Sequence, residues 1–189
     1  MTWKRTAGAS VLAARACLRS GVGLLTVHVP FCNNFIVQTS VPEAMTELDI
    51  SDTCFAAATD TDDYQAVAIG PGLGKAAETE AALLEQIETC QTPMVVDADA
   101  LNLLGEKRNY IGRLPRELAK SAGVHIILKG AYSAIVTPAG KCFFNPTGNP
   151  GMATGGSGDV LTGVVLALLA QGYEPEKAAC LATYVHGLA

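Results

Sequence analysis

The sequence predicts a single α/β domain with a mostly parallel central sheet, covered by helices on both faces. Three observations indicate this class. Short apolar runs alternate with helical segments, a glycine-rich turn connects one such run to a helix, and 49% of the 189 residues are hydrophobic whereas 16% are charged. Strands buried on both faces appear as short apolar runs, and helices supply the crossovers of a parallel sheet. The chain is long enough to enclose one sizeable core.

The N-terminal part predicts a helix followed by two strands. Residues 7–20 are rich in alanine and leucine, which favour a helix, and Gly21 can end it in a left-handed conformation. Residues 23–29 predict a strand, which Pro30 stops. The apolar run at residues 35–38 predicts another strand.

The middle of the chain predicts alternating strands and helices. Apolar runs at residues 66–69, 94–96 and 125–128 predict buried strands. Residues 76–89 carry apolar positions on one helical face, and residues 118–122 form the end of a further helix. This alternation is typical of a parallel sheet.

The C-terminal part predicts a β-hairpin and two helices. Residues 133–136 and 142–144 flank a short turn with proline and glycine, which favours an antiparallel pair. The last predicted helices cover residues 160–170 and 175–189. Since no repeat or linker divides the chain, we interpret residues 1–189 as one domain.

Charge and cysteine content exclude several classes of function. The formal net charge is −5, whereas a non-specific nucleic-acid binder is basic. The longest apolar run, residues 164–170, is far too short to cross a membrane. The six cysteines form no Cys-x-x-Cys motif and the three histidines lie far apart, so no protein metal site is predicted. We expect reduced, mostly buried thiols in a cytoplasmic protein.

The glycine-rich segment 149–159 carries the strongest functional signal. It contains four glycines and runs directly into an apolar helix. Backbone N–H groups from Gly155 to Gly158 can converge on an anion at this helix start, where the helix dipole favours negative charge. Asp159 is then either a carboxylate stabilised by the dipole or a base beside a bound phosphate, and we expect its surroundings to keep it ionised. No Gly-Lys-Ser/Thr follows, so this is not a Walker A loop.

A second glycine turn, residues 70–74, follows a predicted strand. Ligands bind at such strand ends in open α/β sheets. Lys75 stands where a dinucleotide fold would have its third glycine, so the Gly-x-Gly-x-x-Gly spacing fails. The turn by itself is a weak signal.

Two further candidates lie at predicted strand ends. Lys129 is either a phosphate-binding cation or a solvated side chain. Asp97 and Asp99 would face the same way on an extended segment. They suit Mg²⁺ or a ribose, or they cap the next helix.

Together these segments resemble the ADP/ATP-dependent NAD(P)H-hydrate dehydratases, which are carbohydrate-kinase-like proteins of the YjeF C-terminal type with a ribokinase-like fold. The likeness covers almost the whole chain, at residues 8–9, 12–15, 20–24, 70–74, 97–102, 128–130 and 148–159. The last motif is the most specific. Sugar and vitamin kinases of this fold share Gly-x-Gly-Asp but normally lack the Asn-Pro-Gly-Met-Ala lead-in.

The resemblance implies repair of the S-hydrate of NADH or NADPH. ADP or ATP, with Mg²⁺ held mostly by phosphates and water, donates a phosphoryl group to the hydrate, and loss of phosphate restores NAD(P)H. Asp159 is the implied catalytic base. The implied nucleotide-binding residues are Lys129, Gly130, Ala131, Tyr132, Ser133, Gly155, Gly156, Ser157 and Gly158. The implied substrate-binding residues are Ala9, Gly72, Gly74, Asn149 and Asp159. We also expect a homo-oligomer.

The sequence departs from the family pattern in three places. No strand precedes the first helix, the chain stops at residues 186–189 where the family continues, and residues 104–125 lack the family's Thr-Pro-His-Pro-x-Glu block. The histidine of that block helps the family bind the hydrate. Because Pro115 closes one segment and the next begins mid-helix without a cap, we expect a break between Arg116 and Glu117.

Two other functions stay open. One is a kinase of the same fold that phosphorylates a stable small alcohol, such as a sugar or a thiazole. The other is a nucleotide-binding subunit without activity, which would bind ADP and not turn it over.

Overall fold

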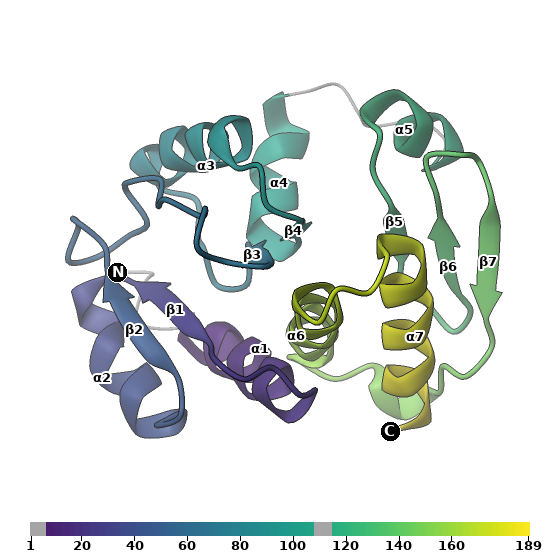
Figure 1. Ribbon diagram of the computed structural model, residues 1–189, viewed down its shortest axis with the longest axis horizontal. Helices are drawn as coiled ribbons and strands as arrows, with labels where there is room; N and C mark the ends of the chain where they lie inside the picture. Colours follow the sequence, from purple (N-terminus) through teal and green to yellow (C-terminus); the bar gives the residue numbers. More distant parts are fainter. Residues whose placement is uncertain (1–6, 108–114) are drawn as a thin grey trace.

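Helices and strands are mixed along the computed structural model, which describes residues 7–107 and 115–189 (Figure 1). The helices are α1 (Ala7–Arg19), α2 (Phe31–Ser40), α3 (Ala77–Thr89), α4 (Ala98–Lys107), α5 (Pro115–Ala122), α6 (Ser157–Ala170) and α7 (Pro175–Leu188), with a short 3₁₀ turn η2 (Pro150–Met152). The strands are β1 (Thr26–Val29), β2 (Met45–Leu48), β3 (Val67–Ile69), β4 (Met94–Val96), β5 (Ile126–Leu128), β6 (Ser133–Val136) and β7 (Cys142–Asn145).

The strands form three groups. β1 pairs with β2 and β3 pairs with β4, both in parallel, whereas β5, β6 and β7 form an antiparallel meander. The predicted α/β class and the β6–β7 hairpin are therefore confirmed. The parallel pairing expected of the central sheet is present in β1–β2 and β3–β4, and within the described residues no backbone ladder joins the three groups.

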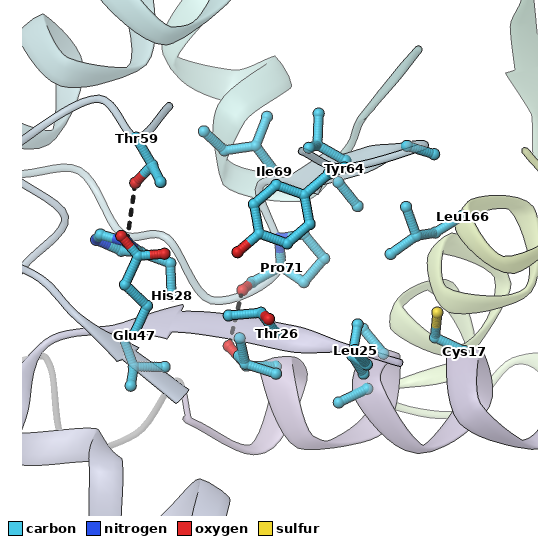
Figure 2. A pocket seen from close by; sticks show the side chains of 18 of the residues that line it. Cys17, Leu25, Thr26, His28, Glu47, Thr59, Tyr64, Ile69, Pro71 and Leu166 are labelled. Carbon is cyan, nitrogen blue, oxygen red and sulfur yellow. Dashed lines mark hydrogen bonds and ion pairs between the residues drawn. The ribbon is translucent and has the colours of Figure 1, made fainter. Parts of the chain in front are cut away.

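A hollow of about 270 Å³ lies between β1 and β3, where the sheet is interrupted (Figure 2). Leu25 comes just before β1 and Ile69 from β3, while Cys17 of α1 and Leu166 of α6 close one side. The side chains that line it are mostly apolar. The two parallel pairs therefore face each other across a hydrophobic space instead of sharing hydrogen bonds.

Helices α1 and α6 pack closely against each other in the centre of the molecule (Figure 1). Gly163 lies at their contact, where an added Cβ would collide with the carbonyl oxygen of Ala13. Gly156, just before α6, has a φ of 91° and lies so close to Leu12 that a Cβ would strike that side chain. Glycine at these two positions lets α6 and the residue before it approach α1 closely.

Helix α2 replaces the strand predicted at residues 35–38. Within it, Asn33 and Val37 are buried, one helical turn apart, whereas Phe35 is 79% exposed. A short apolar run suits either a strand or a helix, and here tertiary packing selects the helix because only one face is covered. The neighbouring strand β2 was not predicted.

Helix α5 covers the region where a break between Arg116 and Glu117 is expected. Both residues lie inside this helix, which begins at Pro115. Proline is well suited to a first helical position, because its missing N–H has no partner there in any case. The stretch just before it, residues 108–114, lies outside the described residues.

All six cysteines are free thiols, as predicted. The prediction that most of them are buried is wrong, because only Cys17 and Cys54 are buried and Cys32 is exposed. Burial raises the pKa of Cys17 to about 11. Among the described helices, none is both long and apolar enough to span a membrane.

A buried carboxylate organises the loop after β2. The Asp49 side chain is 0% exposed and lies 2.9 Å from a ring nitrogen of His28 on β1. The backbone N–H groups of Ser51 and Ala56 donate to the same carboxylate at 2.8 and 2.9 Å. Burial by itself would raise the pKa of Asp49, but these donors and His28 outweigh it and the pKa falls below its ordinary value.

Asp49→Asn is expected to lower the free energy of unfolding by about 1–3 kcal/mol at neutral pH, because buried donors lose a charged acceptor. A carboxylate whose folded pKa is lowered stabilises the protein above its ordinary pKa, and the contribution disappears as the pH falls through the folded value. Urea unfolding at several pH values measures this. Asp60→Asn, which changes an exposed carboxylate, serves as the control. A stability difference that stays constant from neutral to acidic pH would contradict the prediction.

Candidate functional site

The first turn of α6 provides backbone donors for an anion. The N–H groups of Gly155, Gly156, Gly158 and Asp159 form no hydrogen bond within the described part of the chain. The first N–H groups of a helix lack partners inside it and attract negative charge. The helix predicted at residues 160–170 is present as α6, which begins at Ser157, inside the glycine-rich segment.

Lys129 brings a positive charge to the same place. It follows β5, and its Nζ occupies the space that a Cβ on Gly158 would take. The glycine therefore lets the ammonium group lie directly over the first turn of α6. Free N–H groups and a cation at one point are the usual elements of a phosphate site.

The segment that follows Lys129 lies against the start of the glycine-rich segment. A Cβ on Gly148 would come within 2.8 Å of the Ala131 carbonyl oxygen, so backbone approaches backbone there. Ser133 opens β6, and its hydroxyl is 3.5 Å from the carbonyl oxygen of Gly130. Tyr132 is 71% exposed. Of the predicted nucleotide residues, Lys129 thus lies against Gly158, whereas Gly130 and Ala131 lie against Gly148 just before the glycine-rich segment.

Two carboxylates come from the junction of β4 and α4. Asp97 Oδ2 accepts a hydrogen bond of 2.6 Å from Thr162 Oγ1, and Asp99 Oδ2 accepts one of 2.9 Å from the Gly74 N–H. Ala98 between them has a φ of 48°, which is unusual for a residue with a side chain. The prediction that both carboxylates face the same way on an extended segment is wrong, because α4 begins at Ala98 and turns Asp99 toward the glycine turn.

The glycine turn and the start of α1 form the opposite side. Ser10 Oγ donates to the Pro71 carbonyl oxygen at 3.3 Å, which joins the start of α1, where Ala9 also lies, to this turn. Gly72 and Gly74 both have positive φ values, of 69° and 79°. Through Asp99, the predicted substrate residue Gly74 is connected to the carboxylates near Asp159.

Asn149 has a local structural role. Its Oδ1 accepts a hydrogen bond of 2.9 Å from the Gly151 N–H and caps η2. This bond holds the lead-in to the glycine-rich segment in place.

Asp159 lies between these two sides, in the first turn of α6. Burial raises the pKa of its carboxyl group, and the negative charges of Asp97 and Asp99 raise it as well, while Lys129 opposes them. The shift of the Asp159 pKa is therefore opposite in direction to the one that the helix start alone would give. A carboxylate with a raised pKa is a stronger proton acceptor once ionised.

The hollow between β1 and β3 is a separate space. Gly72 lines it, but Asp159, Lys129 and Gly158 do not. Across residues 7–107 and 115–189, no group of three or more histidine, cysteine, aspartate or glutamate side chains is arranged to hold a metal ion.

Sequence reasoning missed two contacts at this site. Thr162 reaches Asp97 from α6, and His186 of α7 places Nε2 2.9 Å from the Ser157 carbonyl oxygen. Thr162 lies three residues after Asp159, so helical spacing would place it beside Asp159 once the helix start is known. No local signal in the sequence connects His186 to Ser157.

Solved structures first establish the class of protein. A ribokinase-like superfamily protein from Enterococcus faecalis is 26% identical, with a TM-score of 0.79 over 98% of this chain and 74% of that one. The ADP/ATP-dependent NAD(P)H-hydrate dehydratase from Bacillus subtilis, co-crystallised with ATP/Mg²⁺, is 30% identical, with a TM-score of 0.80 over 97% of this chain and 75% of that one. The chain has the ribokinase-like α/β fold.

The family follows from the sequence comparisons. The carbohydrate-kinase family model for NAD(P)H-hydrate dehydratase matches residues 3–114 and 111–189. The bifunctional NAD(P)H-hydrate repair enzyme of Moorella thermoacetica is 37% identical over 96% of this chain and 42% of its own length. The ADP-dependent (S)-NAD(P)H-hydrate dehydratase of Bacillus subtilis is 31% identical over 95% of this chain and 74% of its own length. This chain belongs to the NAD(P)H-hydrate dehydratase family.

The extent of these matches is relevant to the Thr-Pro-His-Pro-x-Glu block that residues 104–125 lack. The chain spans less than half the length of the bifunctional relatives. The Moorella alignment runs over 221 positions although this chain has 189 residues, so that relative carries residues without a counterpart here. The family model divides at residues 111–114, inside the region where the block is absent.

Proposed function

We propose that this chain dehydrates the S-form of NADH or NADPH hydrate, with ADP or ATP as phosphoryl donor. The observation that carries the proposal is the convergence at the start of α6 of a half-buried carboxylate, a lysine ammonium and free backbone N–H groups. These supply a base, a cation and an oxyanion site for one phosphoryl transfer.

The donor nucleotide binds along residues 129–133 and the start of α6 in this proposal. Lys129 and the N–H groups of Gly155, Gly156 and Gly158 hold the phosphate that is transferred. Mg²⁺ accompanies the nucleotide and neutralises phosphate charge, held mostly by phosphate and water oxygens. The arrangement is consistent with an acidic protein, because backbone N–H groups supply most of the attraction.

The hydrate lies on the other side of Asp159, against Ala9, Gly72 and Gly74. Asp159 accepts the proton of the hydrate hydroxyl as its oxygen attacks phosphorus, and the bond from phosphorus to the departing nucleotide breaks, which leaves AMP from ADP or ADP from ATP. Phosphate leaves far more readily than hydroxide. The ring nitrogen lone pair expels it, and loss of a proton from the adjacent ring carbon restores the double bond of NAD(P)H.

Turnover on the purified chain tests this function. The chain is incubated with S-hydrate and either ADP or ATP, and return of the absorbance of reduced nicotinamide is followed. We expect turnover with at least one nucleotide and none without nucleotide. Nucleotide binding without turnover would instead indicate a non-catalytic subunit, and phosphorylation of a stable alcohol without recovery of NAD(P)H would indicate a small-molecule kinase.

A further inference from the structure

A hydroxyl of α6 contacts the carboxylate that follows β4. Thr162 Oγ1 lies 2.6 Å from Asp97 Oδ2 and 3.2 Å from the Gly158 carbonyl oxygen. The hydroxyl has one proton, and the shorter distance to a charged acceptor assigns it to Asp97. Because Thr162 is only 3% exposed, little water competes for this bond.

Asp97 is itself held firmly by its backbone. Its N–H donates to the Ile69 carbonyl oxygen at 3.1 Å, and its own carbonyl oxygen accepts from the Ala100 N–H at 3.1 Å. Gly70 lies so close that a Cβ there would collide with the Asp97 carbonyl oxygen. Thr162 is therefore hydrogen-bonded to a residue, Asp97, whose backbone is held at the ends of β3 and β4.

The hydrogen bond between Thr162 and Asp97 also bears on the first turn of α6. Thr162 lies three residues after Asp159, and its oxygen also approaches the Gly158 carbonyl. Asp97 is the charged neighbour with the largest influence on Asp159, followed by Lys129 after β5 and Asp99 on α4. From α7, His186 contacts the Ser157 carbonyl oxygen.

We propose that Thr162 and Asp97 act as a positioning pair, in which the hydroxyl fixes the Asp97 carboxylate beside Asp159 and holds the first turn of α6 against β4. The proposal rests on the proposed function of Asp159 as the base. A link that only joined α6 to β4 would need no charge, and placing one carboxylate near another costs free energy. The charge of Asp97 makes Asp159 a better proton acceptor, which an apolar contact would not do.

The test combines turnover with titration of Asp159, followed by NMR of isotopically labelled side-chain carboxylates. Thr162→Val removes the donor and nearly keeps the shape, Thr162→Ser keeps the donor, and Asp97→Asn removes the charge. Thr183→Val is the matched control, since Thr183 is also a 3% exposed helical threonine but its hydroxyl donates to carbonyl oxygens of its own helix.

We expect Thr162→Val to lower kcat by roughly 10- to 100-fold with little change in ADP binding, the usual cost of a small misplacement of a reacting group. Thr162→Ser should restore most of the rate. In Asp97→Asn, and less so in Thr162→Val, the titration midpoint of Asp159 should fall, whereas Thr183→Val should leave it unchanged.

The titration separates this proposal from the proposed function. An Asp159 midpoint that is the same in the unmodified chain and in Asp97→Asn overturns the positioning pair, whatever the turnover. Equal rates for Thr162→Val and Thr162→Ser overturn it as well. If the midpoint falls as expected but the unmodified chain shows no turnover of the hydrate, the pair stands and the proposed function fails.

Discussion

Asp159→Asn is expected to lower turnover of the S-hydrate by roughly 10²–10⁴-fold, the usual contribution of a general base. Asparagine keeps the shape of the side chain and cannot accept the hydroxyl proton. Nucleotide affinity should change much less, because the backbone N–H groups at the start of α6 and the Lys129 ammonium remain. Steady-state turnover beside calorimetric ADP binding measures both quantities.

The pH dependence of turnover is a second test of the role of Asp159. A base works only when ionised, and the pKa of Asp159 is raised by burial and by Asp97 and Asp99. Turnover should therefore fall as the pH drops through this raised value, at a higher pH than an ordinary aspartate would give. In Asp159→Asn the residual activity should lose this dependence.

Asp63→Asn is the control for this substitution, because Asp63 is exposed and far along the chain from the first turn of α6. It should keep the unmodified rate. A variant at position 159 that retains most of its turnover would mean that Asp159 only caps the helix and that the base lies elsewhere.

Local sequence signals were sufficient for most elements of the fold. The glycine-rich segment indicated the start of α6 because glycine density and the apolar run after it point to one boundary. The prediction failed at residues 35–38, where only Val37 of the apolar run is fully covered. Propensity describes a residue and its neighbours, and here the burial of a single face decided between strand and helix.

The interrupted sheet could not be read from the sequence. The strands β1, β2, β3 and β4 all pair in parallel, but their pairing order depends on contacts between distant segments. The hollow lies between β1 and β3, and the two strand pairs form no backbone ladder with each other across it. Apolar patterning predicts a buried strand and does not identify its neighbour.

In the candidate site too, some features could be predicted from the sequence and others could not. Sequence motifs indicated Asp159, Lys129 and the glycines, and the structure brings them together around Gly158. The direction of the Asp159 pKa could not be anticipated, since it depends on burial and on Asp97 and Asp99 from a different part of the chain. Thr162 was overlooked because a threonine inside an apolar helix carries no signal until its partner, Asp97, is placed beside it.

Lys129→Met is expected to weaken ADP and ATP binding by roughly 10- to 100-fold, the usual effect of losing a hydrogen bond between charged groups. Its Nζ lies over Gly158, where the transferred phosphate is proposed to bind, and methionine keeps the chain length without the charge. Because Lys129 lowers the pKa of Asp159, its loss should also move the acidic fall in turnover to higher pH. Lys141→Met, which removes an exposed ion pair with Glu176 at 3.2 Å, is the matched control and should bind ADP normally. Calorimetric titration with ADP compares the two variants. Equal affinities would place the nucleotide phosphates away from Lys129, and the donor side of the site would then have to be reassigned to the glycine turn at residues 70–74.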